Sequence, residues 1–219
     1  MTADEIDCAF RGRVDDKVAP FLWSAEDVRS YRSEAIREYC RRVPIVDNAT
    51  ASVCQINVTA NQPTYALQGS VLFVNRVKLA SQEHPLRDFE RDTLDEYRAG
   101  WETETGTPEG WIEPMTGFIT LVPIPVAADK LLLEVGRLPL EDIHQGSDEP
   151  EIQQKDHFVL LDWMCHLAYL KQDADAYDQA KSDRWAVYFT NKVGPRLDSR
   201  RDLLRREMAR GPRRVRARY

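Results

Sequence analysis

The spacing of apolar residues changes twice along the chain, and this change restricts the folds that the chain can adopt. Apolar residues recur at helical spacing over residues 24–44, alternate in short runs over residues 52–135, and return to helical spacing over residues 152–195. A helix and a strand require different periods, so we expect an α+β fold. We predict a helical bundle from the N- and C-terminal segments, with a small antiparallel β-sandwich or barrel domain inserted between them.

Local patterns predict the first helix. Ser24 is a suitable N-cap, and Pro44 ends the helix. The predicted apolar stripe consists of Val28, Tyr31, Ala35 and Tyr39. The opposite face carries Arg29, Arg32, Arg37 and Arg41 and is expected to be solvated, with contact to an acidic neighbour as the alternative. Residues before Phe21 mix charges without a clear period and are expected to form an arm or a poorly specified first element.

The middle of the chain predicts strands. Residues 71–79 form the strongest candidate, followed by residues 118–122 and 130–135. Residues 87–98 fit either a short helix or an insertion between strands. If they form a helix, its inward residues are Phe89, Leu94 and Tyr97.

Two helices are expected in the C-terminal half, over residues 152–171 and 174–193, and they should pair antiparallel. The first is predicted to bury Phe158, Leu161, Met164, Cys165 and Ala168. The complete predicted division is an N-terminal arm and bundle helix (1–50), an inserted β domain (51–146), the remaining bundle (147–195) and an arginine-rich C-terminal helix and tail (196–219).

Charge is distributed unevenly. Residues 196–219, the arginine-rich tail, contain ten arginines and three carboxylates and carry +7, so a total of −6 leaves −13 on residues 1–195. Guanidinium groups bind carboxylates and phosphates in bidentate geometry. We therefore predict a docking element with a helix over residues 197–209 and an end over residues 211–219 that orders on binding. Its candidate docking residues are Arg200, Arg201, Arg205, Arg206, Arg210, Arg213, Arg214, Arg216, Arg218 and Tyr219.

Several sequence patterns indicate the cellular compartment of the protein. No run approaches the roughly 18 apolar residues of a membrane span, and Asp4, Glu5 and Asp7 stand where a secretory signal carries basic residues. We expect a protein that is made and kept in a cytoplasm, without a membrane partner. The four cysteines, predicted to be buried free thiols, are Cys8, Cys40, Cys54 and Cys165.

Catalytic motifs are missing from the sequence. It contains no glycine-rich phosphate loop, nucleophile elbow or zinc-protease motif. Asp162 and His166 have the four-residue spacing of two helical metal ligands, but no further pair lies in register, which favours an ordinary histidine. We predict no enzymatic activity, cofactor or metal. An enzyme assembled from residues distant in sequence is the third possibility.

Tryptophans can act as stacking platforms for nucleic-acid bases. Trp101, Trp111, Trp163 and Trp185 have acidic rather than basic neighbours, however. We therefore predict that they pack in a core or an interface.

An ordered set of packing residues extends over about residues 20–190. Its members are Leu22, Trp23, Ser24, Asp27, Tyr31, Glu34, Ala35, Cys40, Arg41, Arg42, Tyr65, Leu67, Pro108, Gly110, Trp111, Leu121, Pro123, Pro125, Leu131, Leu132, Leu133, His157, Leu161, Ala168 and Tyr169. Each motif is made of common packing residues and is not specific by itself. The resemblance to a known family depends on the order and spacing of the motifs. In this order the chain resembles the head-tail adaptor (connector) proteins of tailed bacteriophages.

The resemblance implies a virion protein of the phage neck, assembled in the host cytoplasm. It implies a homo-oligomeric ring, commonly of twelve subunits, that lies beneath the portal, joins head to tail and passes DNA through its lumen without sequence-specific binding. The implied partners are the portal, tail or neck proteins and further copies of the chain. The arginine-rich tail would dock on the portal, and Arg29, Arg32 and Arg37 are inter-subunit candidates.

The alternative is a nucleic-acid-binding or DNA-packaging accessory protein that uses the arginine-rich tail on phosphates. Asp198, Asp202 and Glu207 argue against this alternative, because they lie at helical spacings from arginines and would pair with them.

Overall fold

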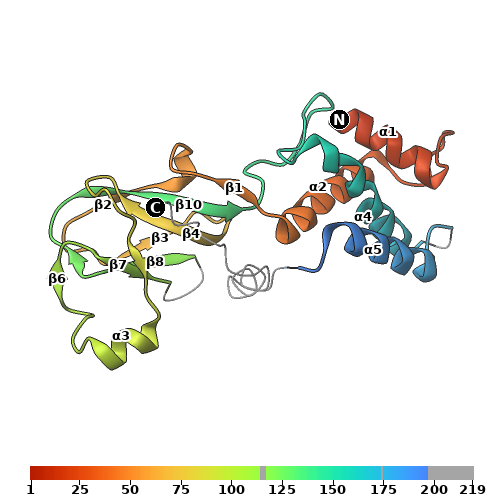
Figure 1. Cartoon of the computed structure of the whole chain (residues 1–219). Coiled ribbons are helices and arrows are strands. Elements are labelled where there is room, and N and C mark those ends of the chain that lie inside the picture. The colour runs from red at the N-terminus through yellow and green to blue at the C-terminus, as the bar shows by residue number, and fades with distance from the viewer. Residues whose placement is uncertain (114–116, 174, 197–219) are drawn as a thin grey trace, which may run out of the picture. The chain divides into compact units, whose positions relative to one another are not determined.

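The computed structural model describes residues 1–113, 117–173 and 175–196 (Figure 1). The chain divides into two compact units, a helical unit formed by Met1–Val43 and Ile143–Tyr219, and a β unit formed by Pro44–Asp142. Over the described residues, the long helices fall in the first unit and the sheets in the second. The predicted α+β class is therefore confirmed.

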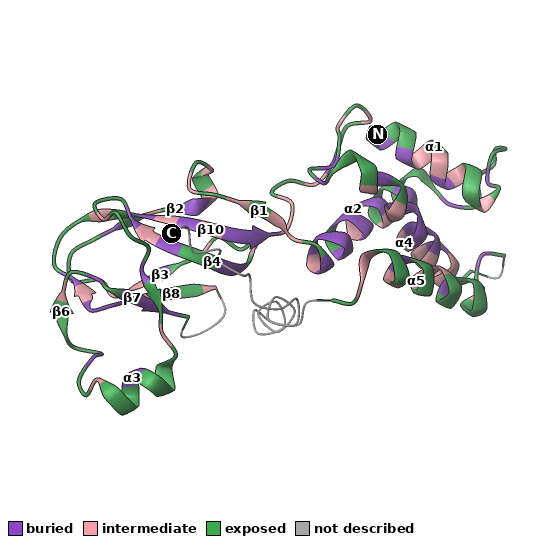
Figure 2. Ribbon diagram, viewed as in Figure 1, coloured by how far each residue is buried: buried purple, intermediate pink, exposed green. Residues whose placement is uncertain are grey.

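The helical unit is built around one central helix. Its described helices are α1 (Ala3–Val14), α2 (Ala25–Arg42), α4 (His157–Leu170) and α5 (Gln179–Val193), and a short 3₁₀ turn, η2 (Gln154–Asp156), directly precedes α4. Helix α4 contacts α1, α2 and α5. Figure 2 shows buried residues along α2 and α4, as this central position requires.

Local capping explains where α1 and α2 begin. The Ser24 hydroxyl accepts the Asp27 N–H (3.1 Å), and the Asp27 carboxylate accepts the Ser24 N–H (3.0 Å), as in a capping box. Thr2 and Glu5 form the same reciprocal pair at the start of α1. Of the two alternatives for this segment, the arm is therefore wrong, because much of the segment is a capped helix and forms a first element.

The segment between α1 and α2 is fixed by a buried carboxylate. Asp16 accepts the Leu22 N–H at 2.9 Å and is ion-paired with Arg11 at 2.6 Å. Trp23 is buried, and its indole N–H donates to the Ala168 carbonyl at 3.1 Å. These contacts tie the start of α2 to α1 and α4.

The β unit contains three sheets over its described residues. The strands are β1 (Ile45–Asp47), β2 (Gln55–Val58), β3 (Thr64–Ala66), β4 (Val71–Leu79), β5 (Arg87–Asp88), β6 (Thr105–Gly106), β7 (Gly110–Ile112), β8 (Phe118–Val122), β9 (Ile124–Pro125) and β10 (Asp129–Arg137). The unit also contains a short 3₁₀ turn, η1 (Ser52–Cys54), and a short helix, α3 (Arg91–Tyr97).

Strand β10 organises the first sheet. One edge pairs with β4 over most of its length, and β1 and β2 pair with successive parts of the strand, all antiparallel. The second sheet has the order β3-β8-β7-β5, and the third joins β6 to β9. One apolar cluster contains residues of the first two sheets, including Val77, Leu133, Trp111 and Leu121.

Four predictions about packing require correction. No sheet closes on itself within the described part, so the barrel alternative is wrong; the β5–β7 and β6–β9 pairs are parallel rather than antiparallel. Tyr97 is 77% exposed instead of inward, whereas Leu94 is buried. Phe158 is 59% exposed, because α4 is apolar on nearly every face and its sequence cannot indicate which face stays uncovered.

Candidate functional site

The predicted docking residues from Arg200 to Tyr219 lie outside the described residues, as does the predicted helix over residues 197–209. The first arginine of the arginine-rich tail, Arg196, is described. It follows the end of α5, where Gly194 has φ +96° and Pro195 prevents continuation of the helix. Arg196 is therefore the residue of the arginine-rich tail whose contacts the structure describes.

Arg196 binds a buried carboxylate on α2. The side chain of Glu38 is fully buried. The Arg196 Nε donates to its two oxygens at 2.9 and 3.0 Å, and Nη2 donates to Oε2 at 2.5 Å. Arg42 donates from Nε to Oε1 at 2.8 Å. Arg41 also donates, from Nη1 to Oε2 at 3.4 Å. Three guanidinium groups thus share one carboxylate, and we call Glu38, Arg41, Arg42 and Arg196 the Glu38 cluster.

Arg42 links the Glu38 cluster to the packing of α4 and α5. Its Nη1 donates to the Thr190 hydroxyl and to the Gly194 carbonyl, both at 2.9 Å. Its guanidinium lies 5.2 Å from the ring centroid of Trp163 and 4.8 Å from that of Phe189. Burial by itself raises the pKa of Glu38, but hydrogen bonds from Arg196 and Arg42 outweigh this effect and lower it below its usual range.

A second buried carboxylate joins three helices. Asp162 on α4 accepts from Arg13 of α1 at 2.5 Å and from Lys192 of α5 at 2.6 Å. His166 instead faces the Ser182 hydroxyl, 2.8 Å from its Nδ1. Asp162 and His166 have the four-residue spacing of two metal ligands, but each therefore binds its own partners in the helical unit. Nowhere in the described part do three or more His, Cys, Asp or Glu side chains gather to hold a metal ion.

The arginine row of α2 does not form one solvated face. Arg29 and Arg37 are exposed, as predicted. Arg32 is 2% exposed and donates to the Asp7 carboxylate at 2.5 Å, with longer contacts to the carbonyls of Ala3 and Ile143. Arg32 is therefore an internal link between α1 and α2. At this position the face is not solvated and instead meets an acidic neighbour, which was the alternative prediction.

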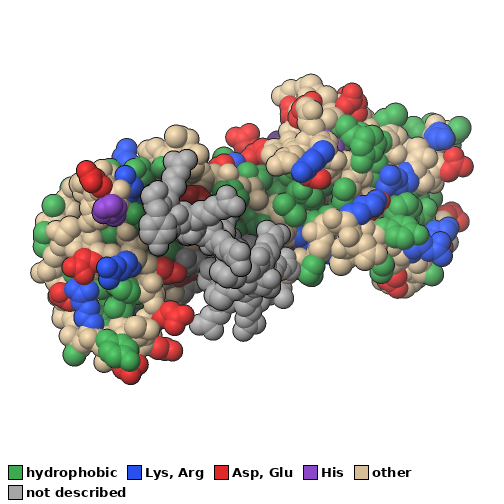
Figure 3. All heavy atoms as spheres, viewed as in Figure 1, with side chains coloured by type: hydrophobic (Ala, Val, Ile, Leu, Met, Phe, Trp, Pro, Cys, Tyr) green, Lys and Arg blue, Asp and Glu red, His purple; other side chains and the backbone are tan. Residues whose placement is uncertain are grey.

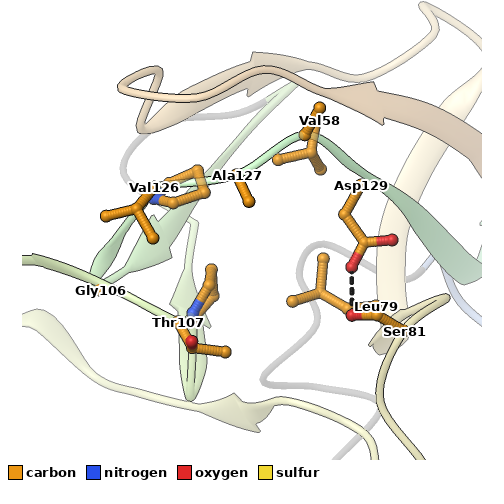
Figure 4. Close-up of a pocket in the computed structure, with 11 residues that line it drawn as sticks. Val58, Leu79, Ser81, Gly106, Thr107, Val126, Ala127 and Asp129 are labelled. Carbon is orange, nitrogen blue, oxygen red and sulfur yellow. Dashed lines mark hydrogen bonds between the residues drawn. The ribbon is translucent and has the colours of Figure 1, made fainter.

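The β unit contains a pocket of about 230 Å³ (Figure 4). Its lining residues are Val58, Leu79, Ser81, Gly106, Thr107, Pro108, Pro125, Val126, Ala127, Ala128 and Asp129. Ser81 donates to one Asp129 oxygen at 2.5 Å, and the Lys130 N–H donates to the other at 2.7 Å. Both carboxylate oxygens are thus satisfied locally, and the remaining side chains of the lining are mostly apolar and small.

All four tryptophans pack against other side chains, as predicted. The ring centroid of Trp163 lies 5.1 Å from that of Phe189, and that of Trp185 lies 5.6 Å from that of Tyr188. Trp101 and Trp111 are 6% and 1% exposed. Trp163 and Trp185 are half-buried, and each lies beneath an arginine of the helical unit. Of the cysteines, Cys40, Cys54 and Cys165 are buried free thiols as predicted, but Cys8 is exposed.

Exposed apolar side chains occur beside basic ones on the helical unit. On α5, Val187 and Tyr188 are 54% and 45% exposed, close in sequence to the exposed Arg184. Figure 3 shows hydrophobic and basic side chains next to one another on the visible face of this unit. Protein interfaces commonly combine these groups.

Charge separates the chain into three parts. The β unit has 15 carboxylates and seven basic residues, a net charge of −8. The helical unit without residues 196–219 carries −5, and those residues carry +7. No helix within the described part combines the length and apolar character needed to cross a membrane.

An arginine-rich sequence and mixed apolar and basic surfaces are features by which proteins bind other macromolecules. The family model described as SU10 adaptor protein matches residues 1–216. The chain therefore belongs to the SU10 adaptor protein family, which is consistent with the predicted resemblance to phage adaptors. No curated protein matches the chain.

Proposed function

We propose that this chain is a structural, non-enzymatic head-tail adaptor of a tailed phage. It forms a homo-oligomeric ring under the portal, commonly of twelve subunits, joins head to tail and lines the DNA channel. The arginine-rich tail docks on the portal. The observation that carries this proposal is membership of the adaptor family over nearly the whole chain, and the charge distribution supports it.

The acidic β unit supports passage of DNA without retention. Its excess of eight negative charges would repel phosphates. Arginines that would otherwise bind phosphate are paired inside the units, including Arg32 with Asp7 and Arg137 with Asp47. A channel wall of this composition offers DNA few cations.

The same proposal gives a role to the predicted bundle and inserted sandwich. The helical unit would carry the contacts to neighbouring subunits, with the exposed Arg29 and Arg37 as candidates. The first two sheets of the β unit, which share one apolar core, would form the sandwich. A ring requires two complementary surfaces on each subunit. Arg32, being buried, is removed from this set of candidates.

Mixing the purified chain with isolated portal rings tests the function. Native mass spectrometry should detect a ring of chains on each portal, and truncation after Arg196 should abolish the association while the helical circular dichroism persists, because the described units remain intact. Arg91→Ala, at an exposed position on α3 and outside the arginine-rich tail, is the control that should still assemble. Equal portal binding by the intact and truncated chains would refute docking through the arginine-rich tail.

The ten arginines of residues 196–219 favour a second candidate, a nucleic-acid-binding accessory protein. That function predicts DNA affinity that falls steeply with salt, since each neutralised phosphate releases counterions. A chain that binds DNA in this way and fails to assemble on a portal would support this candidate over the adaptor.

A further inference from the structure

One side of α5 combines basic and apolar side chains and is exposed. Arg184, Tyr188 and Lys192 are four residues apart, so they follow one another along the same side of the helix. Val187, three residues after Arg184, lies beside them. All four residues are exposed. We call Arg184, Val187, Tyr188 and Lys192 the α5 face.

Contacts within the helical unit hold the α5 face in place. The ring centroid of Tyr188 lies 5.6 Å from that of Trp185, and the Arg13 guanidinium lies 5.4 Å from the Trp185 ring. Lys192 donates to the buried Asp162 at 2.6 Å. These side chains are therefore largely ordered before any partner binds, which reduces the entropy that binding would cost.

A second exposed surface, on α3 of the β unit, has the opposite charge. Asp92 and Glu96 are exposed and four residues apart, and Tyr97, next to Glu96, is 77% exposed. On the inner side of the helix, Leu94 packs in an apolar cluster with Trp101. The inner side thus fixes α3 to the β unit and leaves the outer side free of that core. We call Asp92, Glu96 and Tyr97 the α3 face.

The two faces complement each other in charge. Residues 88–104, which include α3, contain seven carboxylates and two arginines, a net charge of −5. Figure 3 shows acidic and apolar side chains next to one another at the end of the β unit where Figure 1 places α3. Helix α5 contains three basic residues and one carboxylate, Asp183, which accepts a hydrogen bond from Gln179 at 2.8 Å. Each face also supplies an exposed tyrosine, a residue type that is enriched at protein interfaces.

We propose that the α5 face of one copy of the chain binds the α3 face of a second copy. Both faces are exposed in the single chain, which leaves each of them uncovered. Opposite charges orient the contact, and the tyrosines and Val187 supply apolar area. Because the two faces differ, each bound copy keeps one face for the next copy, as a ring requires. This contact rests on the proposed function, since it would join neighbouring subunits of the ring.

Charge reversal in the full-length chain tests the contact. Arg184→Glu and Glu96→Arg should each weaken self-association about tenfold, because each places like charges opposite one another. A mixture of the two variants should associate again, since each variant then supplies the charge that the other requires. Sedimentation velocity and native mass spectrometry measure association, with and without portal rings. Arg76→Glu and Glu141→Arg make the same charge changes at exposed positions on other elements and should have no effect.

The outcomes separate this contact from the proposed function. A mixture of Arg184→Glu and Glu96→Arg that associates no better than either variant alone would overturn the contact. Rings that form on portals equally well with wild type and both variants would also overturn it, while the ring itself would stand. Association that responds to both reversals and to mixing, but gives no ring on a portal, would support the contact and refute the ring. Loss of DNA binding in Arg184→Glu with unchanged self-association would instead identify the α5 face as a phosphate-binding surface.

Discussion

The buried position of Arg32 provides a quantitative test of the helical unit. Arg32 is 2% exposed, and its Nη1 donates to an oxygen of Asp7, whose side chain is 28% exposed. Arg32→Ala removes a charge-assisted hydrogen bond worth about 1.5–3 kcal/mol and leaves a cavity where the side-chain stem packed. Asp7 regains some hydration, which reduces the penalty for its lost partner. We expect a loss of about 3 kcal/mol in the free energy of unfolding.

Arg29→Ala is the matched control, because Arg29 lies one turn earlier on α2 and is exposed. It should change the free energy of unfolding by less than about 0.5 kcal/mol. Urea unfolding followed by helical circular dichroism and by tryptophan fluorescence measures both variants and separates the two units if they unfold apart. Equal effects of Arg32→Ala and Arg29→Ala would refute the buried link, as would a double-mutant cycle with Asp7→Ala that gives no coupling.

Three further predictions address other contacts. Trp23→Phe should lower the free energy of unfolding by about 1–2 kcal/mol, because the Ala168 carbonyl on α4 loses the hydrogen bond from the indole N–H. An unchanged midpoint of urea unfolding would contradict this role. Gly110→Ala should destabilise the β unit, since an added Cβ would overlap the Phe89 ring, whereas Gly69→Ala has open space and should be tolerated. Equal thermal midpoints for the two variants would refute the close approach. Because the folded-state pKa of Glu38 is lowered, its contribution to stability is present above the unfolded-state pKa and is lost as pH falls through the folded-state value. Acid titration of unfolding should therefore be shallower in Glu38→Gln, and parallel titration curves would contradict the assignment.

The local patterns that predicted elements correctly depend on neighbours in sequence. The predicted strand over residues 71–79 coincides with β4, and the helix beginning after Ser24 has its predicted cap. At the N-terminus, Thr2 and Glu5 supply the same capping signal. Helix α1 buries few apolar residues, among them Ile6 and Phe10. Its sequence therefore shows mixed charges without a clear apolar period, and the capping signal was not recognised.

The sequence by itself determined the alternation of helix-rich and strand-rich parts, the excess of acid in residues 1–195 and the arginine content of residues 196–219. Those properties follow from residue type and short spacing. Only the tertiary structure decided which charges are internal. Glu38 and Arg42 are a helical i to i+4 pair that spacing can suggest, but Arg196 reaches Glu38 from 158 positions away. Arg32 belongs to the same predicted row of arginines as the exposed Arg29 and Arg37, yet the packing of α1 against α2 buries it. Such contacts arise from how distant segments meet, and no local period encodes them.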